Sequence, residues 1–307
     1  MKSVIYLGNG FDIALGLKTR YSQFISSVFF QKLLGKNKLA EYIYFMNKEY
    51  NWSDVEEMLY EYSRDLGCGN EEKNEKFKKE HYDISMALQE YISDDSTNTG
   101  NNKLNKLIIS WLNNVEVLRV CSFNYTPTPV LSHLLPDYVN LYRIHGIANV
   151  GQLNDKMKIV LGIDRSMTVC KAHEFLYKDN IKLDDSEVRS GFRPPTQKEK
   201  IIARDIVKTE MQPLFHDAEI IIIYGCSMGR SDTTYFKYLF DNSYNRLFII
   251  YHYGHDEKSI LRQRINEITR GKFPIKNIVF IDSSIEGGYR SELSEMISRG
   301  LVTIKSV

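Results

Sequence analysis

Residues 4–17 read VIYLGNGFDIALGL, and they are the most informative part of the chain for its fold. An apolar run ends at Leu7, a turn follows at Gly8-Asn9-Gly10, and a helix is predicted to begin near Phe11 or Asp12. Glycines in such a turn let the backbone approach a phosphate closely, and the first N–H groups of a helix supply donors and partial positive charge. The stretch therefore predicts a strand-turn-helix unit that can cradle a pyrophosphate.

This turn departs from the dinucleotide-binding fingerprint of dehydrogenases. That fingerprint needs a third glycine where the chain has Ile13, and an acidic residue about 20 positions further on at the end of a second strand. Around that point the sequence reads Val28-Phe29-Phe30. An ordinary dehydrogenase is therefore disfavoured, and a tight strand-to-helix turn without a ligand is the alternative to a nucleotide site.

Further apolar runs have the composition of buried parallel strands. They are rich in β-branched or aliphatic residues, as expected for strands covered by helices on both faces. We therefore expect an α/β fold with a Rossmann-type open parallel sheet and a ligand at the carboxyl ends of the strands. The predicted strands are Ser3–Leu7, Val117–Cys121, Glu219–Tyr224, Leu247–Tyr251 and Asn277–Ile281, with a short alternating strand before His145.

A helical insertion is predicted between the first two main strands, because apolar residues recur there at a spacing of three to four. A single domain is expected, with its core at about 1–20 and 115–307 and the insertion at about 21–114. The polar tracts Gly67–Glu80 and Ser93–Asn102 predict loops. The predicted helices of the insertion are Tyr21–Leu34, Leu39–Tyr50, Trp52–Leu66 and Lys103–Leu112.

The composition is that of a soluble globular protein. Forty Lys and Arg residues face 39 acidic ones, so the net charge of +1 gives no electrostatic case for nucleic acid or an anionic membrane as the main partner. Small polyanionic ligands remain possible, because a local site needs only a few donors. No stretch approaches about 18 consecutive apolar residues, and the N-terminal apolar run is too short for a signal peptide. We expect a cytoplasmic protein.

The cysteines give no indication of a metal site. Four are present, without a C-x-x-C pair or a Cys/His cluster at zinc spacing, so no structural zinc is expected. Cys121 and Cys226 lie beside predicted strands and are expected to be small buried hydrophobic residues.

Polar residues lie at the ends of four of the predicted strands. Asn124 can hold a sugar or a water through its amide, or can be an ordinary turn residue before a proline. His145 ends its short strand before a glycine; it suits proton transfer from a hydroxyl, although a structural histidine is the alternative. Asp12 can cap its helix or bind a ribose hydroxyl. The turn from Gly225 to Asp232 can close over the other side of a nucleotide.

Together these segments resemble the AbiH family of phage abortive-infection proteins. The resemblance covers most of the chain, and its opening motif is the most specific part. The matching segments are LGNGFD at 7–12, LGLKTRYSQF at 15–24, WSDVE at 52–56, FNYT at 123–126, HG at 145–146, GID at 162–164 and YGCS at 224–227.

The same segments resemble, more distantly, the sirtuin-like NAD-binding fold. Its G-A-G-x-S, G-I-P, N-x-D, H-G and G-T-S motifs are similar to the segments that begin at Gly8, Gly16, Asn124, His145 and Gly225. The departures from that pattern include Asp12 for serine, Lys18 for proline and Thr126 for aspartate. The chain also lacks the zinc module of paired C-x-x-C motifs, which argues against a protein deacylase.

The second resemblance implies a sirtuin-like NAD hydrolase of an antiphage system, which cleaves the nicotinamide–ribose bond of NAD, its substrate, without a metal. The implied catalytic residues are Asn124, which positions the ribose and the attacking water, and His145, which accepts a proton. The implied NAD-contacting residues are Gly8, Asn9, Gly10, Phe11, Asp12, Arg20, Gly225, Ser227 and Asp232. Gly8, Asn9 and Gly10 are expected to hold the pyrophosphate through their N–H groups, and Ser227 and Asp232 to lie on the adenosine side.

Other functions stay open. Thr126 in place of an acidic residue would suit a nucleotide sensor without turnover. An interaction or toxin protein could instead use the helical insertion to hold a phage or host component. A phage-derived or host protein trigger, or assembly into a homo-oligomer, would fit an effector that must stay inactive until infection. A nuclease is disfavoured, because no tight carboxylate cluster with lysine occurs at metal-site spacing.

Overall fold

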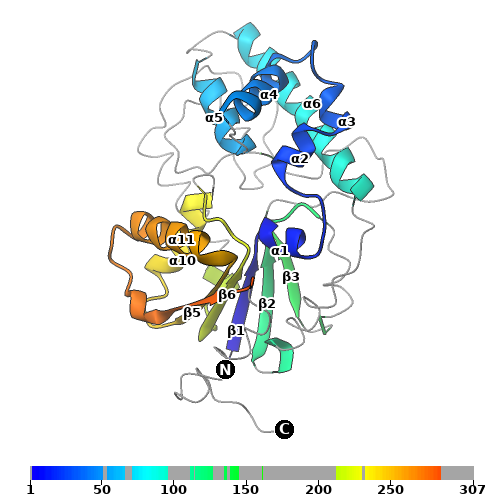
Figure 1. Ribbon diagram of the computed structural model, residues 1–307. Coiled ribbons are helices and arrows are strands. Elements are labelled where there is room, and N and C mark those ends of the chain that lie inside the picture. The colour runs from blue at the N-terminus through cyan, green and yellow to red at the C-terminus, as the bar shows by residue number, and fades with distance from the viewer. Residues whose placement is uncertain are drawn as a thin grey trace.

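Six parallel strands form one sheet in the order β3-β2-β1-β4-β5-β6 (Figure 1). The open parallel sheet of a Rossmann-like α/β fold, predicted from the apolar runs, is thereby confirmed. The computed structural model describes residues 2–50, 54–65, 71–95, 111–113, 115–126, 135–136, 139–144, 161, 212–229 and 232–284. The strands are β1 (Lys2–Leu7), β2 (Glu116–Ser122), β3 (Asn140–Arg143), β4 (Ile220–Tyr224), β5 (Leu247–His252) and β6 (Ile278–Asp282).

The order of the strands reverses beside β1. The chain passes from β1 to β2 and β3 on one side of it, and then returns to β4 on its other side. Leu7, the last residue of β1, pairs with Ser122 of β2 and with Tyr224 of β4. Ligands of open parallel sheets bind outside the carboxyl ends of the strands at such a reversal. The ends of β1, β2 and β4 therefore mark the expected place of a site.

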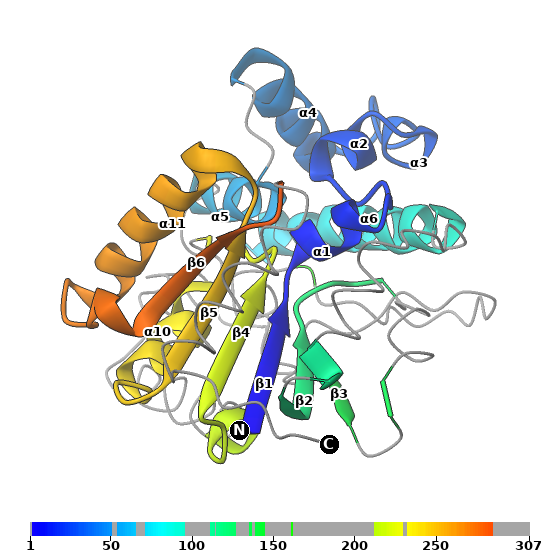
Figure 2. The same cartoon turned by 60° about the horizontal axis from the view of Figure 1, so that its bottom comes forward.

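Each face of the sheet packs against its own hydrophobic cluster, because successive strand residues point to opposite faces. On one face the cluster includes Val4 and Tyr6 of β1 and the apolar residues of α10 (Thr233–Asp241) and α11 (Gly254–Thr269). On the other face Ile5 and Leu7 pack with α1 (Asn9–Ala14) and with Trp111. Figure 2 shows α10 and α11 together along one side of the sheet.

A separate group of helices, here called the helical unit, lies above the carboxyl ends of the strands in Figure 1. It has a hydrophobic core of its own, which includes Phe24, Phe30, Ile43, Leu59 and Phe77. This confirms the helical character of the insertion predicted after residue 20. The helices of the unit are α2 (Tyr21–Ile25), α3 (Val28–Gln31), α4 (Lys38–Tyr50), α5 (Val55–Asp65) and α6 (Glu71–Asp95).

The prediction of loops at Gly67–Glu80 and Ser93–Asn102 is wrong where the structure describes these tracts, because α6 includes 71–80 of the first and 93–95 of the second. The helix is polar on most of its surface and buries only a narrow stripe. Phe77, Ile84 and Leu88 face the core of the unit at the spacing of an α-helix. The amino-terminal end of α6 reads EEKNEKFKKE. It has too few apolar residues for the helical periodicity to be recognised in the sequence.

The other predicted helices agree with the structure to different extents. The predicted helix Tyr21–Leu34 is divided into α2 and α3, and the break falls where the Ser27 hydroxyl caps α3 by accepting from the N–H of Phe30. The helix predicted at Leu39–Tyr50 is confirmed as α4, and that at Trp52–Leu66 is confirmed over α5. Most of the one predicted at Lys103–Leu112 lies outside the described residues.

The turn after β1 and the turn after β4 pack backbone against backbone. The N–H groups of Gly8 and Gly10 donate to the carbonyl oxygens of Tyr224 and Gly225, both at 2.9 Å. A Cβ atom on Gly8 would lie 2.5 Å from the Gly225 oxygen, and one on Gly10 would lie 2.6 Å from the Gly225 Cα. Gly225 itself has a φ of +66°. The three glycines are therefore required by the approach of these two turns.

A buried histidine joins the helical unit to a distant part of the chain. His81 of α6 is 4% exposed, and its Nε2–H donates to the carbonyl oxygen of Leu161 at 2.8 Å. Burial lowers the pKa of His81 from 6.5 to about 4, because the imidazolium would lose its hydration. His81 is therefore neutral in the folded protein at neutral pH.

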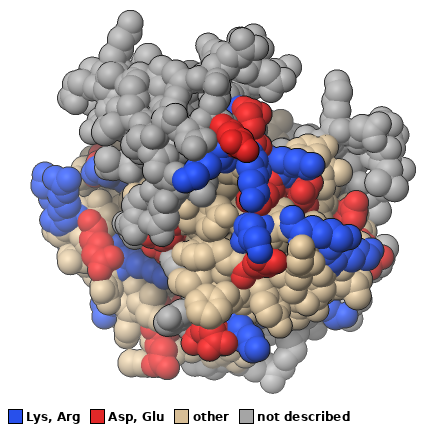
Figure 3. All heavy atoms as spheres, turned by 90° about the horizontal axis from the view of Figure 1, so that it is seen from above, with Lys and Arg blue, Asp and Glu red and all other residues tan. Residues whose placement is uncertain are grey.

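The described surface carries both signs of charge. Seen from above, basic and acidic side chains lie interspersed over the described part of that face (Figure 3). This agrees with the near-zero net charge of the sequence. Among the described residues, no helix is both long and apolar enough to span a bilayer.

We expect Gly8→Ala to destabilise the protein by roughly 2–3 kcal/mol, because the new methyl group would overlap backbone atoms that cannot move independently. Gly254→Ala is the control. Gly254 has a φ of +77° with open space around it, so Gly254→Ala should lower the free energy of unfolding only by the backbone strain, about 1–2 kcal/mol. Gly8 has a φ of −110°, which suits any residue, so backbone preference alone predicts that Gly254→Ala is the more destabilising of the two substitutions. Urea unfolding of both variants decides between the two orders.

Lowering the pH from 7 to 5 is expected to reduce the free energy of unfolding through His81. The unfolded chain binds a proton near pH 6.5 and the folded chain only near pH 4, so stability falls as the pH drops through this window. The expected loss is roughly 2 kcal/mol. His81→Gln should remove this part of the pH dependence, whereas His255→Gln, at a side chain 90% exposed, should retain it. An equal loss in wild type and His81→Gln in urea titrations would contradict the assignment.

Candidate functional site

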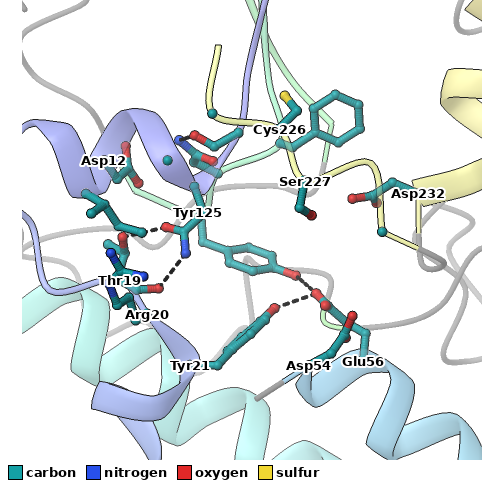
Figure 4. Close-up of a pocket in the computed structure, with 18 of the residues that line it drawn as sticks. Asp12, Thr19, Arg20, Tyr21, Asp54, Glu56, Tyr125, Cys226, Ser227 and Asp232 are labelled. Carbon is teal, nitrogen blue, oxygen red and sulfur yellow. Dashed lines mark hydrogen bonds between the residues drawn. The ribbon is translucent and has the colours of Figure 1, made fainter. Parts of the chain in front are cut away.

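A cavity of about 460 Å³ lies between the carboxyl ends of β1, β2 and β4 and the helical unit (Figure 4). The strand ends, the turns that follow them and the facing helices all contribute to its wall. Besides five apolar side chains, the described residues that line it are Gly8, Asn9, Gly10, Asp12, Thr19, Arg20, Tyr21, Ser22, Asp54, Glu56, Asn124, Tyr125, Thr126, Gly225, Cys226, Ser227, Gly229, Asp232, Glu257 and Arg264.

The glycine turn forms part of the wall, but two of its amides are already used. Gly8 and Gly10 donate to the turn after β4, so their N–H groups are not directed at a ligand as the sequence led us to expect. The side chain of Asn9 bonds to Thr19 through its Nδ2, which donates to the Thr19 carbonyl at 2.9 Å, and through its Oδ1, which accepts from the Thr19 hydroxyl at 2.5 Å. These bonds hold the segment that places Arg20 on the cavity wall.

Asp12 and Thr126 meet in the wall between α1 and the loop after β2. Both side chains are almost fully buried, and the Thr126 hydroxyl donates to Oδ2 of Asp12 at 2.7 Å. The N-cap residue of α1 is Gly8, which has no side chain, and Asp12 lies in the first turn of the helix. Asp12 is therefore a buried carboxylate held by a hydroxyl from a neighbouring strand end.

Asn124 is fixed from two sides. Its backbone N–H donates to the Ser122 hydroxyl at 3.1 Å, and its Nδ2 donates to the carbonyl oxygen of Gly8 at 3.0 Å. Among the described residues no donor bonds its Oδ1. A buried amide with one end anchored and an acceptor oxygen at the cavity suits the positioning of a hydroxyl or a water.

A carboxylate of the helical unit reaches the same cavity. Asp54 caps α5 by accepting from the N–H of Glu57 at 3.0 Å, which places Glu56 in the first turn of the helix. Oε1 of Glu56 accepts from the Tyr21 hydroxyl at 2.5 Å and from the Tyr125 hydroxyl at 3.1 Å. Figure 4 shows the two phenol rings converging on this oxygen from α2 and from the loop after β2.

The turn after β4 forms another wall. Ser227 and Asp232 face the cavity there (Figure 4), and Glu257 and Arg264 of α11 join them. The Arg264 guanidinium donates to the carbonyl oxygen of Ser227. Burial raises the pKa of the Cys226 thiol well above its usual range, so this cysteine is a buried, unreactive thiol, as expected from the sequence.

Nine of the eleven predicted site residues line the cavity: Gly8, Asn9, Gly10, Asp12, Arg20, Asn124, Gly225, Ser227 and Asp232. Phe11 does not, because its ring is fully buried and packs edge-on against Tyr224. His145 lies outside the described residues, so its approach to Asn124 stays a prediction. No group of three or more metal-ligating side chains occurs in the part of the chain that the structure describes.

Six charged or phenolic groups of the wall were not predicted from the sequence, namely Tyr21, Asp54, Glu56, Tyr125, Glu257 and Arg264. The first four lie inside segments that carry the AbiH resemblance, so that resemblance was a usable signal. The other two lie on an ordinary amphipathic helix, where nothing in the sequence separates them from solvated residues.

Thr126→Val is expected to destabilise the protein by about 1–3 kcal/mol, because it leaves the buried Asp12 carboxylate without this donor while keeping the shape of the side chain. Thr126→Ser retains the hydroxyl, so its free energy of unfolding should fall much less. Denaturant unfolding measures both. A valine variant as stable as the serine variant would show that the bond contributes nothing to folding.

Comparison with known proteins gives one family. The family model described as "Bacteriophage abortive infection AbiH" matches residues 4–253, which is well over half of the chain. No curated protein matches the chain. The matched range includes the glycine turn, Glu56, Asn124 and the turn after β4, whereas Glu257 and Arg264 lie beyond it. The distant likeness to sirtuin-like proteins stays a prediction, and the chain belongs to the AbiH family of bacteriophage abortive-infection proteins.

Proposed function

We propose that this abortive-infection protein is an NAD+ glycohydrolase that cleaves the bond between nicotinamide and ribose. The observation that carries the proposal is the cavity at the strand reversal, with Asn124 anchored in its wall beside the Asp12–Thr126 pair. Nucleotides bind at this place in open parallel sheets. A cavity of about 460 Å³ lies within the range that small-molecule sites occupy.

The reaction sets clear demands on the site. The bond between ribose C1′ and the nicotinamide nitrogen breaks, and its electron pair leaves with nicotinamide. A bond forms between C1′ and the oxygen of water, and a proton is released, so the products are nicotinamide, ADP-ribose and H⁺. Positive charge develops on the sugar in between, and negative groups fixed nearby stabilise it.

Asn124 supports the proposal because its amide is held in one orientation. The bond from its Nδ2 to the Gly8 carbonyl leaves Oδ1 to accept from a ribose hydroxyl or from the attacking water. A group that is already positioned spares the reaction the cost of ordering it. His145 is proposed to accept the proton, as the sirtuin-like pattern implies.

The Asp12–Thr126 pair weakens the case for a sensor without turnover. That case rested on Thr126 in place of the aspartate of the sirtuin-like pattern. Asp12 stands where that pattern has a serine, and the hydrogen bond joins the two positions. One carboxylate and one hydroxyl are thus present, with their places exchanged, so the site has not lost its acidic group.

Purified protein incubated with NAD+ is expected to release nicotinamide and ADP-ribose, which chromatography detects. His145→Ala should slow the release by about 10²- to 10⁴-fold, the usual value of a general base, and Asn124→Ala should slow it at least as much. His255→Ala, at an exposed side chain of α11 outside the cavity, should keep full activity.

Other outcomes identify other functions. The protein would be a nucleotide sensor if it binds NAD+ but forms no products. The same result should then hold in extracts of phage-infected cells, which would contain a trigger. Neither binding nor turnover would reject NAD+ as the ligand. A stable complex with a phage or host component that forms equally well with Gly10→Trp would identify an interaction protein.

A further inference from the structure

The charges in the cavity wall are unequal. Among the described residues that line it, five carboxylates face two guanidinium groups. A ligand with only negative charge would be repelled by most of this wall, whereas a ligand with a separate positive end would be attracted by part of it. The carboxylates belong to Asp12, Asp54, Glu56, Asp232 and Glu257, and the guanidinium groups belong to Arg20 and Arg264.

The carboxylate of Glu56 is distinguished by its surroundings. Glu56 is 6% exposed and lies in the first turn of α5, where the partial positive charge of the helix favours an anion. The hydroxyls of Tyr21 and Tyr125 both donate to its Oε1, so this oxygen is held from two sides. Burial first, and then the Glu56 carboxylate, raise the pKa of Tyr21 well above its usual value, so Tyr21 stays protonated as a donor.

Charged groups of both signs line two sides of the cavity. Tyr21, Asp54 and Glu56 lie together on the side of the helical unit, whereas Ser227 lies on the side of β4 (Figure 4). Arg264 belongs to that second side, because it donates to the Ser227 carbonyl, and Asp232 and Glu257 line the cavity there as well. The cavity therefore has an acidic, phenolic end at the helical unit, next to Arg20, that is separate from the mixed wall holding Arg264.

We propose that Glu56, held by Tyr21 and Tyr125 and assisted by Asp54, forms the subsite for the positively charged nicotinamide–ribose end of NAD+. This rests on the proposed glycohydrolase function and adds to it a residue supplied by the helical unit. Glu56 attracts the pyridinium charge of bound NAD+ and the charge that develops at C1′, and it forms no bond to either. The phenol rings add their own attraction for a cation.

Glu56→Gln separates this role from a purely structural one. A cluster that only joined the helical unit to the sheet would need the hydrogen bonds but not the charge, and the amide oxygen of glutamine can still accept from both tyrosines. Glu57→Gln is the matched control. It removes the same charge one residue further along α5, at a side chain that does not line the cavity.

Calorimetric titration with three ligands measures the effect. They are carbocyclic NAD+, which keeps the pyridinium charge and resists hydrolysis, NADH, whose ring is neutral, and ADP-ribose, which lacks the ring. Wild type and Glu57→Gln are expected to bind carbocyclic NAD+ about tenfold more tightly than NADH. Glu56→Gln is expected to bind both with equal affinity, with its affinity for ADP-ribose unchanged.

Four results would overturn the proposal. A Glu56→Gln variant that keeps the preference for the charged ring would show that the carboxylate does not sense it. Equal weakening of all three ligands would show that the cluster only supports the structure. Wild type that releases nicotinamide but lacks the preference would reject the subsite and leave the glycohydrolase, whereas wild type that binds none of the ligands would reject both.

Discussion

The contact between the turns after β1 and β4 is the constraint on which the rest of the structure depends. Gly8 and Gly10 bond to the backbone at Tyr224 and Gly225, and no side chain fits between the two turns. This contact closes the strand ends at the reversal of the sheet, and it orients the Gly8 carbonyl that anchors Asn124. It also brings Ser227 and Asp12 into the wall of the same cavity.

Much of the sheet could be predicted from the sequence, because buried parallel strands are short apolar runs that end in turns. The same apolar runs also predicted a ligand site at the carboxyl ends of the strands. The reason for the glycines could not be predicted, since a turn that approaches a phosphate and a turn that approaches another backbone need the same residue. The amino-terminal half of α6 was missed because its buried stripe holds few apolar residues such as Phe77.

The helical unit does more than cover the strand ends. Through Glu56 it shares hydrogen bonds with Tyr125, which follows β2, so the two parts of the chain meet in the cavity wall. Residues of both parts are therefore needed to complete the site, and neither part presents all of its charged groups alone. A sheet of this kind without such a unit would offer the glycine turn and Asn124 to a ligand, but not the acidic end.

The strand order also bears on how such a protein is made in the cell. β1 is central in the sheet, yet its neighbours are residues 116–122 and 220–224, so the first strand waits for most of the chain to emerge from the ribosome. The cavity wall extends in sequence from Gly8 to Arg264. A nascent or prematurely terminated chain therefore has no complete site.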